Sequence, residues 1–245
     1  MCTVSWIHSR DGYELFCNRD ELLTRKAALP PQVVDIRGMK AIAPCDGDFG
    51  GSWISVNEVG LSLCLLNLYE ASRRQEEFTS RGLLLMELAD CSSREDVIGR
   101  IRKKRLGHFQ PFTLLALAAA EPALIVQWNG RECLIERNGD EQMPLTSSSF
   151  NTAGVIASRK RQFGELAASA NMLDANVLLD FHRSHKPSFG AYSTCMHRTD
   201  AATVSFSQIN VTGDSITFRY HPKSPCSESP SGTNTEIKIL PRIKR

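Results

Sequence analysis

The sequence predicts an α+β fold in which mainly antiparallel sheets pack together and helices cover them. Predicted strands follow one another directly in pairs joined by short turns, which is the arrangement of antiparallel hairpins. Predicted helices arrive in two blocks between groups of strands, whereas a doubly wound parallel sheet alternates strands with helices. The chain has 245 residues, of which 42% are apolar, and this is enough for a substantial core.

The first predicted element is a hairpin close to the N-terminus. Residues 3–8 and 13–18 are short runs rich in β-forming residues. The segment between them contains Asp11-Gly12, a dipeptide that strongly favours a hairpin turn. We therefore expect two adjacent antiparallel strands here.

This hairpin determines which residues lie beside Cys2. If the Asp-Gly dipeptide forms the two turn residues, Cys2 lies opposite Glu21, and a turn centred one residue earlier places it opposite Arg19. Opposing Cβ atoms in such pairs are about 4.5–5.5 Å apart. Either register brings the polar segment 18–21 next to the thiol.

The remaining elements follow from hydrophobic periodicity and turn residues. Two further hairpins are expected around the turns 57–60 and 212–214, and the predicted strands are 50–56, 61–66, 112–120, 123–129, 133–137, 203–209 and 215–220. Helical spacing predicts helices at 81–89, 92–105, 160–170 and 174–183. The second of these helices opens with a capping box, Ser92-x-x-Glu95.

We expect residues 1–221 to form a single domain. From Pro222 to Thr235 the composition turns to serine, proline and glycine, which disfavours a packed core. Residues 222–245 are therefore predicted to form a mobile C-terminal tail.

Charge and hydropathy exclude several classes of partner. The 29 basic and 27 acidic residues give a net charge of +2, which offers no general case for binding nucleic acid or an anionic membrane. The basic run at 100–105 is read as the solvated end of a helix. No run approaches the ~20 apolar residues that a membrane span needs, and no secretory signal is visible.

The eight cysteines are spread singly, and no Cys-x-x-Cys pair is present. This pattern favours reduced thiols in a cytoplasmic protein over a disulfide framework or a structural zinc site. His182-x-x-His185 and Cys195-x-His197 are possible ligand pairs, although such pairs are more often ordinary loop residues. We expect neither a metal nor another cofactor.

Cys2 could have a distinctive reactivity, because removal of Met1 would make it the first residue. It would then carry a thiol and an α-amine whose ordinary pKa of about 7.7–8.0 leaves a useful neutral fraction at physiological pH. A neutral amine can accept the thiol proton, so the nucleophile carries its own base. A cysteine is also easily activated, because its ordinary pKa is about 8.5.

The neighbouring charges can assist this chemistry. Arg19 can lower the pKa of the Cys2 thiol, and Asp20 can accept hydrogen bonds from the α-ammonium group and orient it. The alternative is an exposed strand end with an Arg-Asp ion pair worth less than ~1 kcal/mol.

Three motifs together resemble the NRDE family. They are Met1-Cys2-Thr3, Asn18-Arg19-Asp20-Glu21 and Gly50-Gly51-Ser52-Trp53. The family includes the transport and Golgi organisation protein 2 and is more distantly related to cholylglycine hydrolases and penicillin V acylases. The resemblance implies the four-layer αββα sandwich of the N-terminal nucleophile (Ntn) hydrolases, and it runs from Met1 to about Phe218.

The resemblance also implies roles for individual residues. Cys2 is the implied nucleophile, and Arg19 and Asp20 match the charged pair beside it. Asn67 and Asn151 match donors to the oxyanion, and Arg198 resembles the arginine that begins the family's last strand pair. The chain departs from the family where Asp200 replaces a usual asparagine next to Arg198.

The leading hypothesis is a cysteine hydrolase acting on C–N bonds other than peptide bonds, with a small acyl amide as substrate. The main alternative is a non-catalytic protein that handles haem or lipid on the same fold. A third possibility is an amidohydrolase relic with an intact but silent site.

Overall fold

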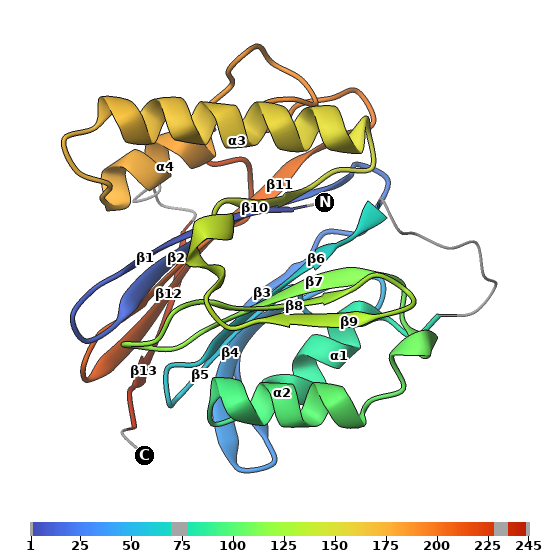
Figure 1. The fold of residues 1–245 in the computed structure, drawn as a ribbon, viewed down its shortest axis with the longest axis vertical. Coiled ribbons are helices and arrows are strands. Elements are labelled where there is room, and N and C mark those ends of the chain that lie inside the picture. Colours follow the sequence, from blue (N-terminus) through green and yellow to red (C-terminus); the bar gives the residue numbers. More distant parts are fainter. Residues whose placement is uncertain (1, 70–77, 228–234, 244–245) are drawn as a thin grey trace.

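The computed structural model describes residues 2–69, 78–227 and 235–243. They form an α+β fold in which two antiparallel sheets stack between outer helices, as Figure 1 shows. Helices α3 (Thr152–Ser169) and α4 (Ala175–Arg183) cover one sheet, and α1 (Arg81–Leu88) and α2 (Arg94–Lys103) cover the other. The layer order is therefore αββα, as the family resemblance implied.

The sheet beneath α3 and α4 has the strand order β10-β1-β2-β11-β12-β13. Its strands are β1 (Cys2–His8), β2 (Tyr13–Leu22), β10 (Leu145–Ser147), β11 (Ala201–Val211), β12 (Ser215–His221) and β13 (Glu236–Pro241). Every neighbouring pair is antiparallel. Strands β10 and β11, both from the second half of the chain, thus flank β1 and β2.

The second sheet follows the chain, in the order β3-β4-β5-β6-β7-β8-β9. Its strands are β3 (Leu29–Ile36), β4 (Met39–Cys45), β5 (Ile54–Asn57), β6 (Ser62–Asn67), β7 (Phe112–Leu117), β8 (Leu124–Trp128) and β9 (Cys133–Glu136). The hairpin of β3 and β4 was not predicted from the sequence. Its outer strand alternates only weakly between buried and exposed residues, so periodicity gave little signal.

The main core lies between the sheets. Inward-facing side chains of both sheets join one apolar cluster, which includes Val4, Trp6, Leu15, Cys64, Leu66 and Ile125. A second cluster lies under α1 and α2, and a smaller one around Phe16 lies under α4. Because each fully buried large apolar side chain contributes roughly 1.5–3 kcal/mol, these clusters hold the layers together.

The N-terminal hairpin adopts the second of the two expected registers. Cys2 pairs with Arg19, and Ser9 N donates to Gly12 O at 3.0 Å to close the turn. This register sets the buried Trp6 opposite the buried Leu15. The other register would have set Leu15 against the exposed His8, so core packing favours the observed pairing.

The end of the chain corrects the predicted domain boundary. Strand β13 pairs with β12, and Leu240 packs into the main core, so the sheet extends beyond residue 221. Ile243 N also donates to Glu58 O at 2.7 Å, which joins this end to the second sheet. Within the predicted tail, residues 228–234 and 244–245 lie outside the described part of the chain.

Two helix starts also differ from the predictions. The helix predicted from residue 160 begins at Thr152 in the structure. The prediction started too late because Thr152, Gly154 and Val155 are weak helix formers, so the first two turns showed little helical signal. The cap of α2 is Ser93, whose hydroxyl accepts from Asp96 N at 3.1 Å, one residue later than the predicted box. In the described residues, no helix is long and apolar enough to cross a membrane.

Candidate active site

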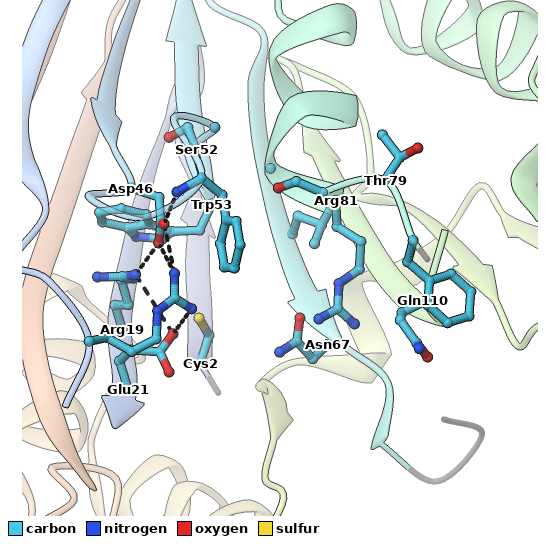
Figure 2. Close-up of a pocket in the computed structure, with 17 residues that line it drawn as sticks. Cys2, Arg19, Glu21, Asp46, Ser52, Trp53, Asn67, Thr79, Arg81 and Gln110 are labelled. Atoms are coloured by element: carbon cyan, nitrogen blue, oxygen red, sulfur yellow. Dashed lines mark hydrogen bonds and ion pairs between the residues drawn. The ribbon is translucent and has the colours of Figure 1, made fainter. Parts of the chain in front are cut away.

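Cys2 lies in a pocket of about 270 Å³ at the ends of strands from both sheets (Figure 2). It begins β1, and Asn67 ends β6 on the facing sheet. Arg19 lies next to Cys2 on β2, whereas Arg81 at the start of α1 lies on the opposite side. The pocket therefore combines a thiol, an amide and guanidinium groups.

The Cys2 thiol is buried, and its surroundings disfavour the thiolate. Its side chain is in the core cluster, and the residue is 5% exposed. The interaction with the neighbouring Cys17 thiol, together with burial, raises the pKa of the Cys2 thiol well above its ordinary value. A nucleophilic attack by this sulfur therefore needs a base that takes up the proton.

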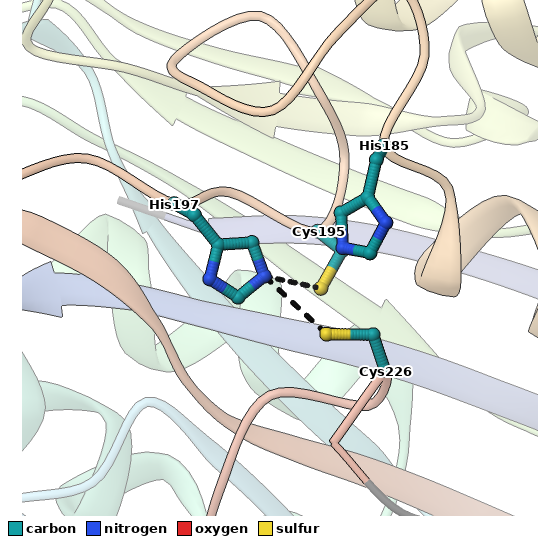
Figure 3. Close-up of side chains that lie close together, drawn as sticks. All are labelled: His185, Cys195, His197 and Cys226. Atoms are coloured by element: carbon teal, nitrogen blue, oxygen red, sulfur yellow. Dashed lines mark hydrogen bonds between the residues drawn. The ribbon is translucent and has the colours of Figure 1, made fainter.

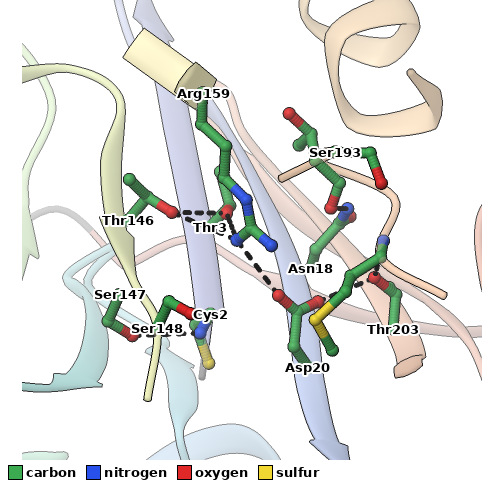
Figure 4. A network of polar contacts seen from close by, with 12 residues as sticks. Cys2, Thr3, Asn18, Asp20, Thr146, Ser147, Ser148, Arg159, Ser193 and Thr203 are labelled. Carbon is green, nitrogen blue, oxygen red and sulfur yellow. Dashed lines mark hydrogen bonds and ion pairs between the residues drawn. The ribbon is translucent and has the colours of Figure 1, made fainter. Parts of the chain in front are cut away.

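Ser147 holds the backbone nitrogen of Cys2. Cys2 N donates to Ser147 Oγ at 3.1 Å, and the two residues are paired across β1 and β10 (Figure 4). The hydroxyl has both a donor and acceptor lone pairs, so it can also bind an amine at this position. No sequence motif indicated Ser147, which is brought to Cys2 from 145 residues away.

Arg19 is held rigidly in the wall of the pocket. Its Nη2 donates to Asp46 Oδ2 at 2.5 Å, and its guanidinium carbon lies 4.3 Å from the centre of the Trp53 ring. Its side chain is only 6% exposed. The stacking and the ion pair fix this cation beside Cys2, which agrees with the predicted proximity.

An ion-pair network continues from Arg19 along the pocket wall. Arg25 binds Asp46 at 2.6 Å, Glu21 at 3.1 Å and Asp48 at 2.7 Å. Of these residues, Glu21, Arg25 and Asp46 line the pocket. The carboxylates on this wall are thus already engaged by arginines.

Asp20 has a different environment from the one predicted. It is fully buried, with its Oδ2 3.1 Å from Arg159 Nη1 and its Oδ1 accepting from Thr203 Oγ1 at 2.7 Å (Figure 4). Arg159 Nη1 also donates to Thr3 Oγ1 at 2.7 Å, which connects the pair to β1. Asp20 therefore anchors a buried cation on α3.

Arg159 was missed because the helix was predicted to start one residue after it. In the observed α3, the buried residues Val155, Ser158, Arg159 and Gln162 share one face. A charged residue on the buried face of a helix is the signal that would have singled it out.

Asn67 and Arg81 face Cys2 from the second sheet and its helix layer. Asn67 Nδ2 donates to Tyr69 Oη at 2.7 Å. Arg81 Nη1 donates to the Pro111 carbonyl at 2.9 Å, and within the described residues it has no carboxylate within ion-pair distance. Burial lowers the pKa of Arg81, which still leaves it cationic at neutral pH.

Glycines let α1 approach the pocket closely. A Cβ on Gly51 would lie 2.3 Å from the Gly82 carbonyl carbon, so only glycine fits there. Gly50 has a φ of +69°, which glycine adopts without strain. The Gly50-Gly51 pair therefore provides both the tight turn and the close backbone approach that Arg81 requires.

Asn151 and Arg198 lie outside this pocket. Asn151 is the residue before α3, with a φ of 38°, and its Nδ2 donates to Tyr192 Oη at 2.7 Å. Arg198 binds Asp200 at 2.6 Å, and its guanidinium carbon lies 4.8 Å from the centre of the Phe150 ring. Neither is among the residues that line the Cys2 pocket. Of the predicted site residues, Cys2, Arg19 and Asn67 line one cavity.

Solved structures with the same architecture are Ntn hydrolases. The chain resembles penicillin V acylase from Agrobacterium tumefaciens with a TM-score of 0.53 at 11% identity, covering 98% of this chain and 91% of that one. It resembles a C2A mutant of conjugated bile acid hydrolase from Clostridium perfringens with a TM-score of 0.53 at 13% identity, covering 98% and 96%.

A third similar structure is the Caenorhabditis elegans orthologue of N-acylethanolamine-hydrolyzing acid amidase. Its TM-score is 0.56 at 10% identity, and the match covers 97% of this chain and 100% of that one. At such low identity, these similarities establish the Ntn-hydrolase fold. No curated protein matches the sequence significantly.

The match to a family model covers most of the chain. The model for Transport and Golgi organisation 2 matches residues 1–222, which include both sides of the Cys2 pocket. The match agrees with the family suggested by the N-terminal motifs. The protein belongs to the Transport and Golgi organisation 2 family.

Proposed function

We propose that this protein is an N-terminal cysteine hydrolase that cleaves non-peptide amide bonds with Cys2, after removal of Met1. The observation that carries the proposal is the meeting of Cys2, Arg19 and Asn67 in one pocket of an Ntn-hydrolase fold. The names of the similar structures support amide substrates, because those proteins are an acylase, a bile acid hydrolase and an amidase.

The first step uses the α-amine of Cys2 as the base. The neutral amine takes the thiol proton while sulfur attacks the acyl carbon, forming a C–S bond and moving the carbonyl electrons onto oxygen. The raised pKa of the buried thiol makes this base necessary. Ser147 Oγ, which already binds the Cys2 nitrogen, accepts a hydrogen bond from the amine and orients its lone pair.

The second step expels the amine. As the tetrahedral intermediate collapses, the C–N bond breaks and the α-ammonium group returns its proton to the leaving nitrogen. A water molecule then attacks the thioester, and the α-amine takes a proton from it. The C–S bond breaks, the acid is released, and the α-ammonium group returns its proton to sulfur, which restores the thiol. Because Arg19 is held beside Cys2, it stabilises the negative charge that develops on sulfur as the thiol proton leaves and again as the thioester C–S bond breaks.

The direct test follows the acyl group on the protein. Mature protein is mixed with a panel of acyl amides and β-lactams, and the N-terminal peptide is weighed by mass spectrometry. We expect loss of Met1 and acylation of Cys2 by at least one compound class. Retention of Met1 would contradict the mechanism, because the peptide nitrogen of Cys2 could not then act as a base.

Asn67 is the proposed donor to the oxyanion. Asn67→Ala is expected to lower kcat by roughly 10²–10³-fold, because it removes a hydrogen bond that strengthens as charge develops on oxygen. The matched variant is Asn151→Ala, since Asn151 donates to Tyr192 away from the pocket, and we expect a change within about twofold. Steady-state kinetics would distinguish the two asparagines, and an equal loss in both variants would argue against this assignment.

Arg81 is proposed to recognise an anionic group of the substrate. It lines the pocket as a cation that lacks a carboxylate partner among the described residues. Arg81→Ala is expected to lower kcat/KM for an acyl amide with a carboxylate tail by roughly 10–100-fold, because a charge-assisted hydrogen bond is lost. The methyl ester of the same substrate serves as the control, and an equal loss for the ester would exclude charge recognition.

A further inference from the structure

Four side chains of types that can bind a metal ion meet outside the Cys2 pocket. They come from the α4–β11 connection and from the segment after β12, and they are His185, Cys195, His197 and Cys226 (Figure 3). One ligand atom from each lies within 4.8 Å of all the others. In the sequence, His182-x-x-His185 and Cys195-x-His197 were possible ligand pairs that are more often ordinary loop residues. The fold adds Cys226, which is 29 residues from His197 in the chain.

The spacing of these atoms suits a tetrahedral metal ion. His197 Nε2 lies 3.4 Å from Cys195 Sγ and 3.3 Å from Cys226 Sγ. With Zn–S bonds of about 2.3 Å and Zn–N bonds of about 2.0–2.1 Å, ligand atoms of a tetrahedral zinc site are about 3.3–3.8 Å apart. Side-chain adjustments of about an ångström would therefore complete the coordination sphere.

The surroundings of the cluster also point to a ligand. His185 Nε2 is buried and has no hydrogen-bond partner among the described residues. The His185 ring stacks on Phe189 with a centroid distance of 3.9 Å, and the His197 ring lies 5.0 Å from the same phenyl ring. Phe189 thus packs against both imidazoles. A buried nitrogen without a partner is costly unless something binds it.

The backbone around the cysteines and histidines is held by specific hydrogen bonds. Cys195 N donates to Ser184 O at 3.0 Å, and Ser193 Oγ donates to Cys195 O at 2.7 Å. Ser224 Oγ donates to Thr203 O at 2.6 Å, which fixes the turn before Cys226 against β11. These contacts bring the separate segments together without any covalent crosslink between them.

We propose that His185, Cys195, His197 and Cys226 form a structural Zn²⁺ site. Two imidazoles and two thiolates favour zinc over harder ions such as Mg²⁺ or Ca²⁺. Binding replaces the two thiol protons with Zn–S bonds and releases both protons to solvent, so no oxidant or reductant is needed. With four protein ligands the site is closed, which is typical of a structural site.

The site would stabilise the environment of Asp20. Thr203 Oγ1, which donates to Asp20, also accepts from Met196 N at 2.8 Å between two of the ligands. Asn18 Nδ2 donates to Thr194 O at 3.0 Å, just before Cys195. Zinc would therefore hold the loop 194–197, which contacts Asn18 directly and Asp20 through Thr203, both on strand β2.

The test is the metal content of full-length protein purified under reducing conditions. Mass-spectrometric metal analysis is expected to find close to one zinc per chain. Cys226→Ser removes a ligand, so it should weaken zinc binding by more than the roughly 10–100-fold that follows from losing a hydrogen bond to a ligand. Cys133→Ser is the matched control, because Cys133 is a half-buried cysteine on β9 outside the cluster, and it should retain the metal.

A second measurement uses the unaltered chain, so its result does not depend on whether a variant folds. After zinc is removed with a chelator, Co²⁺ is added, and tetrahedral coordination by two thiolates should give strong visible bands with a thiolate charge-transfer band. Absence of both zinc and these bands would overturn the proposal. A Cys195–Cys226 disulfide in reduced preparations, or equal metal binding by the Cys226 and Cys133 variants, would also overturn it.

Discussion

Replacing Cys2 with alanine is expected to abolish acylation of the N-terminal peptide and to lower amide hydrolysis by roughly 10⁴-fold or more, because the nucleophile is lost. The change removes only a sulfur atom from a residue that is 5% exposed, so the fold should persist. Circular dichroism and the urea midpoint would verify this. Steady-state turnover and intact mass are the measurements.

Cys133→Ser is the matched control for the loss of a thiol. Cys133 lies on β9 and is not among the residues that line the Cys2 pocket. It is expected to leave turnover unchanged. Full turnover in the Cys2→Ala variant would contradict the proposed mechanism, whatever the outcome for the other cysteines.

A second change separates the thiol from the amine. An N-terminal extension that cannot be removed keeps the Cys2 thiol but converts its amine into a peptide nitrogen. Hydrolysis should then fall by roughly 10²–10⁴-fold, the usual contribution of a general base. If the extended protein turns over normally, Cys2 is a nucleophile that uses some other base.

Replacing Arg159 with methionine is expected to lower the free energy of unfolding by about 3–5 kcal/mol, since it leaves the Asp20 carboxylate buried without its cation. Both side chains are 0% exposed, and their atoms are 3.1 Å apart. Urea unfolding followed by tryptophan fluorescence provides the measurement. The double variant Asp20→Asn/Arg159→Met should recover most of the loss, because the remaining groups are neutral.

Arg161 offers a matched control on the same helix. Its pair with Glu165 is 4.0 Å long, and the two side chains are 63% and 65% exposed. Arg161→Met should therefore cost less than about 1 kcal/mol. Equal losses at the two arginines would mean that the Asp20–Arg159 pair is not buried in solution.

The zinc proposal and the catalytic proposal can fail separately. Cys226 and Cys2 belong to different clusters, so loss of metal binding in Cys226→Ser does not by itself remove the nucleophile. Conversely, a chain without hydrolytic activity can still bind zinc. The metal content and the acylated N-terminal peptide are independent observations.

Local patterns were sufficient to predict much of the fold. The Asp-Gly turn and its flanking β-forming runs predicted the hairpin that brings Cys2 to Arg19, and antiparallel pairing restricted the register to two choices. The blocks of helices predicted layers, which are present. The family motifs then identified the αββα arrangement and the family.

Weak local signals explain where the prediction failed. Strand β13 was missed because the serine- and proline-rich segment before it dominated the composition, and Ile237 and Ile239 remain exposed in the structure. The start of α3 was missed because its first residues have low helix propensity. Because of that error, Arg159 was not among the candidate residues, and its ion pair with Asp20 was not predicted.

The sequence by itself determined that β1 pairs with β2 and that the polar segment 18–21 lies beside Cys2, because a short turn leaves adjacent strands few alternatives. Packing of the core then selected the register that sets Cys2 opposite Arg19. Only the tertiary structure decided that Arg159 neutralises Asp20, that Arg81 faces Cys2, and that Cys226 reaches His197. These contacts join segments far apart in the chain. They depend on how layers pack and loops close, which no local pattern of residues encodes.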